Sequence, residues 1–64
     1  MKFKVGDHVR IYRPVKGMIA FQDATGVIHE VVPESRTPYH ITMDKPVDKW
    51  DQMLFLSREL EKIE

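Results

Sequence analysis

Three histidines, His8, His29 and His40, are the candidate transition-metal ligands of this 64-residue sequence, which contains no cysteine. Imidazole nitrogens bind zinc and similar ions when three or four ligands converge. A three-nitrogen site could form if His29 and His40 faced each other across a hairpin with His8 nearby. The sequence lacks the fixed short spacing of metal-binding histidines, such as His-x-x-x-His. We therefore expect outward-facing strand histidines, with no bound metal and no other cofactor.

Three acidic residues, Asp44, Asp48 and Asp51, surround one predicted loop and are candidate ligands for calcium or candidate paired catalytic carboxylates. A calcium loop of the EF-hand type needs a central glycine, which is missing here, and Lys45 and Lys49 balance the local charge. The sequence also lacks a Ser-His-Asp arrangement, a glycine-rich phosphate loop and a cofactor fingerprint. We therefore expect a protein without catalytic residues that is not an enzyme.

Basic and aromatic residues give the strongest indication of binding. The chain has no net charge, but residues 1–18 carry a net charge of +4 and the remainder carries −4. Tyr12, Phe21 and Trp50 are expected at the surface, because recognition surfaces use amphipathic aromatic residues flanked by charge. Trp50 could alternatively form a lid over one end of the core. The predicted binding residues are Arg10, Tyr12, Arg13, Lys16, Met18, Phe21 and Trp50.

Short strands are expected to position these residues, because four prolines leave little room for helices before residue 47. Alternating apolar residues predict three strands, at residues 8–12, 24–32 and 39–43. Loops are predicted at residues 15–23, 33–38 and 44–49. Gly26, inside the second strand, indicates a bulge or the close approach of another backbone. Tyr39 and Phe55 are expected in the core, since aromatic burial is a large share of what so small a domain has available.

The C-terminal segment fits two patterns. Its apolar residues fall at helical spacing, with Asp48 available as an N-cap, which favours a terminal amphipathic helix. The alternative is a strand at 53–56, a 3₁₀ turn at 57–59 and a closing strand at 60–63. We prefer the strands, because three antiparallel strands in so short a chain would leave their edges exposed unless further strands covered them.

Over nearly its whole length the sequence resembles the small five-stranded SH3-like barrels. The strings VGDHVRIYRP, ATGVIHEV, YHITM and MLFLSRELEKI follow the order and spacing of that family. Shared features are a Gly-Asp opening, a glycine in the second strand, a tyrosine at the start of the third, and an ending with Ser-x-x-Leu. The resemblance implies one all-β domain over residues 1–64, a five-stranded SH3-like barrel with a single 3₁₀ turn before the last strand.

Three groups of such barrels suggest functions. Residues 9–14 and Phe55 are similar to subunit IV of photosystem I, which implies an accessory subunit whose basic face docks an acidic electron carrier. Residues 5–32 resemble KOW-type domains, which implies binding to RNA, ribosomes or RNA polymerase. Residues 52–55 resemble the substrate-binding strand of type II plasmid dihydrofolate reductase, but Gln52 is one position early and would lie on the opposite face. The sequence is also similar in size to small proteins of phages and mobile elements.

We therefore predict a cytoplasmic, non-catalytic binding or accessory module whose partner is a protein. No apolar run has the length of a signal peptide or a membrane span, so we expect no membrane partner. KOW-type nucleic-acid binding is the alternative, because a local charge of +4 can still follow phosphates. A self-associating, pore-forming barrel is the third. A homo-oligomer is expected because so small a monomer could scarcely cover the apolar loop of Met18, Ile19 and Phe21.

Overall fold

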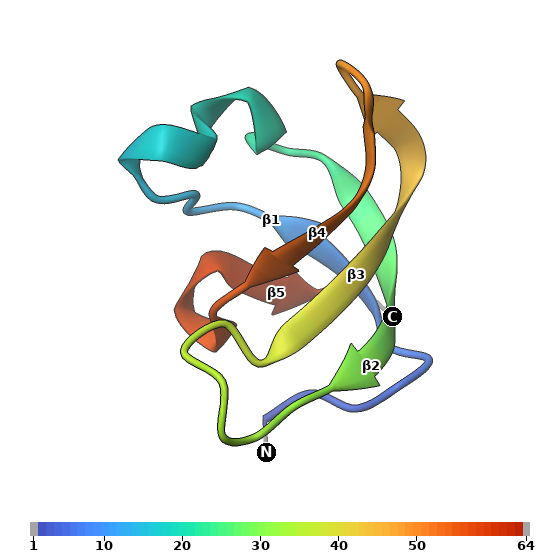
Figure 1. The fold of residues 1–64 in the computed structure, drawn as a ribbon. Coiled ribbons are helices and arrows are strands. Elements are labelled where there is room, and N and C mark those ends of the chain that lie inside the picture. Colours follow the sequence, from blue (N-terminus) through green and yellow to red (C-terminus); the bar gives the residue numbers. More distant parts are fainter. Residues whose placement is uncertain (1, 64) are drawn as a thin grey trace.

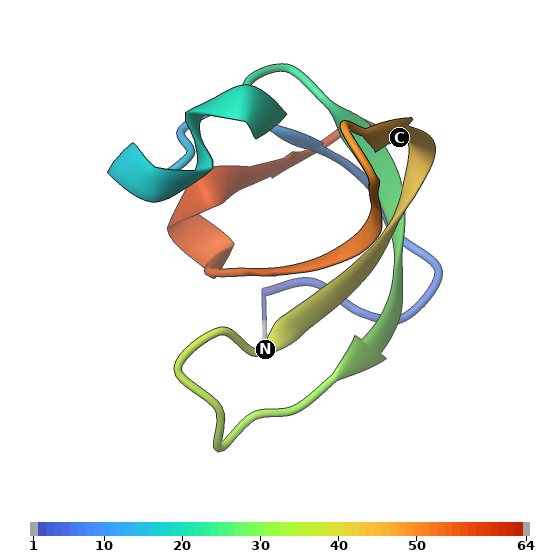
Figure 2. The ribbon, with the colours of Figure 1, turned by 45° about the horizontal axis from the view of Figure 1, so that its top comes forward.

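The computed structural model describes residues 2–63, and its framework is one sheet of five antiparallel strands. The strands are β1 (His8–Ile11), β2 (Thr25–Val31), β3 (Tyr39–Val47), β4 (Trp50–Phe55) and β5 (Leu60–Lys62). They follow the order β4-β3-β2-β1-β5, so the last strand lies beside the first. Two views show the sheet curling around an interior (Figures 1 and 2). The all-β class predicted from the alternating residues is confirmed.

The C-terminal segment forms strands and a 3₁₀ turn, as preferred from the sequence. The turn η2 (Ser57–Glu59) separates β4 from β5, and β5 pairs with β1 through Arg10 and Glu61. The terminal-helix alternative is wrong. Its helically spaced apolar residues do not share a buried face, since Trp50 and Ile63 are exposed whereas Leu60 is buried.

Two segments predicted as loops contain regular structure. Strand β3 continues to Val47, so the predicted loop over 44–49 shrinks to a turn at Asp48 and Lys49. The backbone of Asp48 has φ of 56°, a left-handed conformation that aspartate tolerates better than most residues. Within the first loop, the chain forms a second 3₁₀ segment, η1 (Lys16–Phe21).

One hydrophobic core fills the interior of the curled sheet. Tyr39 and Phe55 are fully buried in it, as predicted. The prediction that Phe21 is exposed is wrong, because its side chain is 4% exposed and packs edge-on against Phe55 with ring centroids 5.6 Å apart. The first loop therefore folds back over the sheet and contributes an aromatic ring to the core. The other buried apolar residues are Phe3, Val9, Ile11, Ile28, Ile41, Met43 and Leu60.

Gly26 allows two strands to approach closely, as its position inside a strand predicted. A side-chain carbon at Gly26 would lie 2.6 Å from both the Ile41 Cγ2 atom and the Thr42 carbonyl oxygen. Any larger residue would therefore force β2 away from β3. The bulge that the sequence offered as the other explanation occurs further along β2, between Ile28 and Glu30.

Candidate binding site beside the first loop

A buried carboxylate fixes the segment that follows β1. The Glu59 side chain, in η2, is 2% exposed and accepts hydrogen bonds from the backbone N–H groups of Val15 (3.0 Å) and Leu56 (2.8 Å). The Glu59 carbonyl oxygen also accepts from the N–H groups of Tyr12 (3.0 Å) and Arg13 (3.3 Å). Because η2 holds this backbone at several points, the side chains of the segment extend from a fixed main chain.

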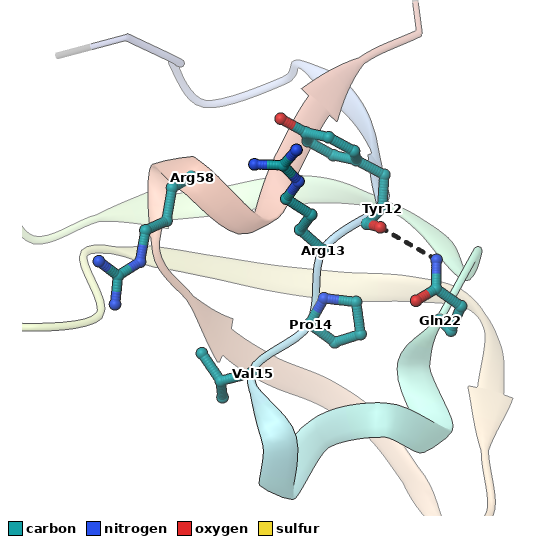
Figure 3. A pocket seen from close by; sticks show the side chains of 6 residues that line it. All are labelled: Tyr12, Arg13, Pro14, Val15, Gln22 and Arg58. Carbon is teal, nitrogen blue, oxygen red and sulfur yellow. Dashed lines mark hydrogen bonds between the residues drawn. The ribbon is translucent and has the colours of Figure 1, made fainter.

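A hollow of about 400 Å³ lies beside this anchored segment (Figure 3). Its lining combines apolar surface with two guanidinium groups. Gln22 closes one side by donating a hydrogen bond from Nε2 to the Tyr12 carbonyl oxygen at 3.0 Å. The lining residues come from the segment that follows β1, the first loop and η2, and they are Tyr12, Arg13, Pro14, Val15, Gln22 and Arg58.

Arg13 and Arg58 give the hollow its positive charge. Within residues 2–63, neither arginine forms an ion pair with an acidic side chain. The Arg13 guanidinium lies 5.7 Å from the centre of the Tyr12 ring, which supports it without neutralising it. Glu59 is adjacent to Arg58 in the sequence, but both of its carboxylate oxygens accept backbone N–H groups. Among residues 2–63, the hollow therefore presents two guanidinium groups without an acidic side-chain partner.

Arg10, by contrast, is already neutralised. Its Nε atom donates to Glu61 at 2.6 Å, and its Nη1 atom lies 3.2 Å from the Asp23 carboxylate. These contacts disfavour the predicted use of Arg10 as a free binding cation. Of the predicted residues on η1, Lys16 is exposed, whereas Met18 is half-buried and packs against the core.

Trp50 lies apart from the hollow, at the start of β4. Its side chain is 49% exposed and contributes to a second hollow of about 240 Å³, together with His29 and His40. This exposure disfavours the alternative in which Trp50 is a lid over the core. The structure thus divides the predicted binding residues, bringing Tyr12 and Arg13 together at the first hollow and placing Trp50 at the second.

The sequence reasoning missed four lining residues of the first hollow, Pro14, Val15, Gln22 and Arg58, and also the buried carboxylate of Glu59. Gln22 lies in the first loop, and Glu59 and Arg58 lie in the predicted 3₁₀ turn. A usable signal was present for Glu59, because an acidic residue at the third position of a turn commonly reaches back to a free N–H group. Arg58, beside it, could then have been placed near the loop that Glu59 holds.

The first loop exposes less apolar surface than its composition suggests. Phe21 is buried and Met18 is half-buried against the core of the same chain. Ile19 remains exposed, with 66% of its surface accessible. Self-association stays a prediction. Of the three apolar loop residues on which it was based, only Ile19 is exposed.

Comparisons with protein-family models, with curated proteins and with solved structures each gave no match. Within residues 2–63, no helix has both the length and the apolar character needed to cross a membrane. The resemblance to SH3-like barrels therefore stays a prediction, and the hollow is interpreted from its own chemistry.

Proposed function

We propose that this protein is a non-catalytic binding module that recognises an acidic, extended segment of a protein partner in the hollow beside the first loop. The observation that carries the proposal is the pair Arg13 and Arg58, which have no acidic partner within residues 2–63 and flank an apolar lining. Guanidinium groups bind carboxylates through paired, directional hydrogen bonds, so an Asp- or Glu-rich segment complements them.

The rest of the hollow suits a peptide better than a free anion. Pro14, Val15 and the ring of Tyr12 add apolar surface to the lining. Such surface can bury apolar side chains that alternate with acidic ones along an extended chain. The contacts from Glu59 fix the backbone before binding, which reduces the conformational entropy that binding would otherwise cost.

Charge favours a protein partner over a nucleic acid. Nucleic-acid affinity depends on several cations that neutralise successive phosphates. Here the chain has no net charge, and Arg10 is already paired with Glu61 and Asp23. The resemblance to a subunit that docks an acidic protein also supports this choice. The KOW-type alternative rests on Tyr12 beside Arg13, a pair on which an unpaired base could stack.

The test uses a dye-labelled acidic peptide of about ten residues in which Glu and Asp alternate with Leu and Pro. By fluorescence anisotropy at low ionic strength, we expect a Kd on the order of 10–100 µM, as for a small, transient interface. The double variant Arg13→Glu with Arg58→Glu should weaken binding at least about tenfold. The matched control, Arg36→Glu with Lys45→Glu, makes the same charge change at exposed positions outside the hollow.

An equal loss in both double variants would contradict the proposal, because net charge alone would then explain binding. A single-stranded RNA of similar length provides the second arm. If the RNA bound more tightly than the peptide, and Tyr12→Ala removed that binding, the nucleic-acid alternative would replace the protein partner.

A further inference from the structure

Two histidines and a glutamate meet on the outer face of β2 and β3 because of the β-bulge. Ile28 pairs with Ile41, whereas the next pair along the ladder is Glu30 with His40, so His29 is an extra residue in β2. In a regular strand, His29 and Glu30 would point to opposite faces. The bulge instead leaves both side chains exposed, beside the outward-facing His40 of the neighbouring strand.

The donor atoms of these three side chains converge. One ring nitrogen of His29, one of His40 and one carboxylate oxygen of Glu30 all lie within 4.8 Å of one another. The Nδ1 atom of His40 lies 3.1 Å from the nearer Glu30 oxygen, and the two imidazole ring centres are 6.1 Å apart. His8 takes no part, because its Nε2 atom lies 2.6 Å from Asp44. The three-histidine site considered from the sequence is therefore not formed.

We propose that His29, Glu30 and His40 bind one divalent transition-metal ion of the zinc type. Two imidazoles and a carboxylate are a donor set that zinc accepts. Bonds of 2.0–2.2 Å in a tetrahedral site place ligand atoms roughly 3.4 Å apart, so small side-chain rotations are needed to close this cluster. Such rotations meet little resistance at His29 and Glu30, which are exposed, whereas the His40 side chain is 24% exposed and changes least. From the spacing of the histidines in the sequence, we expected no metal site. The bulge and the pairing of β2 with β3 bring these side chains together, which their spacing does not show.

Thr42 is a positioning residue for this site. Its hydroxyl oxygen lies 2.9 Å from the Nδ1 atom of His29. When Nδ1–H donates to that hydroxyl, the Nε2 atom of His29 keeps a free lone pair for the metal. A neighbouring group of this kind sets the orientation and tautomer of a metal-binding imidazole.

The second hollow adjoins the cluster and supplies a spectroscopic reporter. His29, His40, Trp50 and Leu54 all line it. Three protein ligands leave a fourth coordination position for water or another ligand. Trp50 is the only tryptophan in the chain, so tryptophan fluorescence reports on this face alone.

The test is a calorimetric titration of the protein with Zn²⁺ alone, at a pH about one unit above the ordinary imidazole pKa of ~6.5. We expect one ion per chain with a Kd on the order of 10 µM. His29→Ala and His40→Ala should each weaken binding at least about tenfold, and Glu30→Gln should do so by roughly tenfold. His8→Ala is the matched control, because it removes a histidine outside the cluster, and its Kd should stay within about twofold of the wild-type value.

Nickel provides an independent readout. Ni²⁺ should quench the fluorescence of Trp50 in the wild-type protein, and His40→Ala should abolish that quenching at the same metal concentration. Circular dichroism checks that the variants remain folded, as expected for surface substitutions. The proposal is overturned if Zn²⁺ does not bind below ~1 mM, a Kd weaker than specific sites show. It is also overturned if His8→Ala weakens binding as much as His40→Ala, or if quenching survives in His40→Ala.

Discussion

The hollow beside the first loop and the outer face of β2 and β3 use acidic side chains in opposite ways. In the hollow, the carboxylate of Glu59 is buried against backbone N–H groups, and Arg13 and Arg58 have no acidic partner within residues 2–63. On the outer face, Glu30 is exposed and contacts His40 directly. Glu59 therefore holds the backbone beside the hollow, whereas Glu30 contacts a side chain at the surface.

The largest expected difference is in stability, between substitutions in the core that holds the first loop and a substitution on the exposed face. Phe55→Ala and Phe21→Ala each remove a ring from a buried edge-on pair, so we expect each to lower the free energy of unfolding by about 3–5 kcal/mol. Leu54→Ala, on the exposed face, should cost less than about 1 kcal/mol. Urea denaturation measures all three. If Phe21→Ala were as mild as Leu54→Ala, the first loop would not be held by the core.

The two glutamates offer a sharper comparison with the same substitution. Glu59→Gln replaces one carboxylate oxygen with an NH₂ group that cannot accept from a backbone N–H group, so we expect a loss of about 2 kcal/mol in the free energy of unfolding. Glu30→Gln should change it by less than about 0.5 kcal/mol, because Glu30 is exposed. Equal losses in denaturation experiments would show that burial of Glu59 does not anchor the loop.

Local pattern was sufficient to predict most of the framework. The alternation of apolar residues located β1, β2 and the start of β3, and the position of Gly26 inside a strand predicted the close approach to β3. For the C-terminal segment, local pattern fitted a helix as well as strands. The need to cover sheet edges decided correctly between them, because edge pairing is a property of the whole sheet.

The candidate site was only partly predictable because its decisive contacts join residues distant in the sequence. Tyr12 and Arg13 were identified from their charge and aromatic character, and the hollow contains both. The neutralisation of Arg10 depends on Glu61, in the strand that pairs with β1 at the other end of the chain. The burial of Phe21 depends on Phe55 in the same way. A single sequence does not encode such contacts in any local spacing.

A third carboxylate, that of the exposed Asp44, should affect how the stability of the protein changes at low pH. Hydrogen bonds from Thr25 and from His8, both at 2.6 Å, hold the pKa of Asp44 below its usual value of 3.8. Because the folded-state pKa is the lower one, this stabilisation is complete above pH ~4 and is lost as the pH falls through the folded-state pKa.

Asp44→Asn should therefore flatten the fall in stability below pH ~4, by less than about 1 kcal/mol because the pair is exposed. Denaturation midpoints measured across that pH range test this expectation. Asp51→Asn removes the same charge at another exposed strand position and serves as the control. Identical acid profiles for Asp44→Asn and the wild-type protein would show that the contacts with Thr25 and His8 do not stabilise the fold.

The most direct test of the proposed function follows the arginine side chains themselves. In a nuclear magnetic resonance titration of the unmodified protein with the acidic peptide, the Nε–Hε signals of Arg13 and Arg58 should shift in proportion to occupancy. Those of Arg10, already paired with Glu61 and Asp23, should stay in place, as should the indole N–H signal of Trp50 on the other face. Shifts concentrated at Arg10 or Trp50, with Arg13 and Arg58 unchanged, would contradict the assignment of the hollow as the binding site.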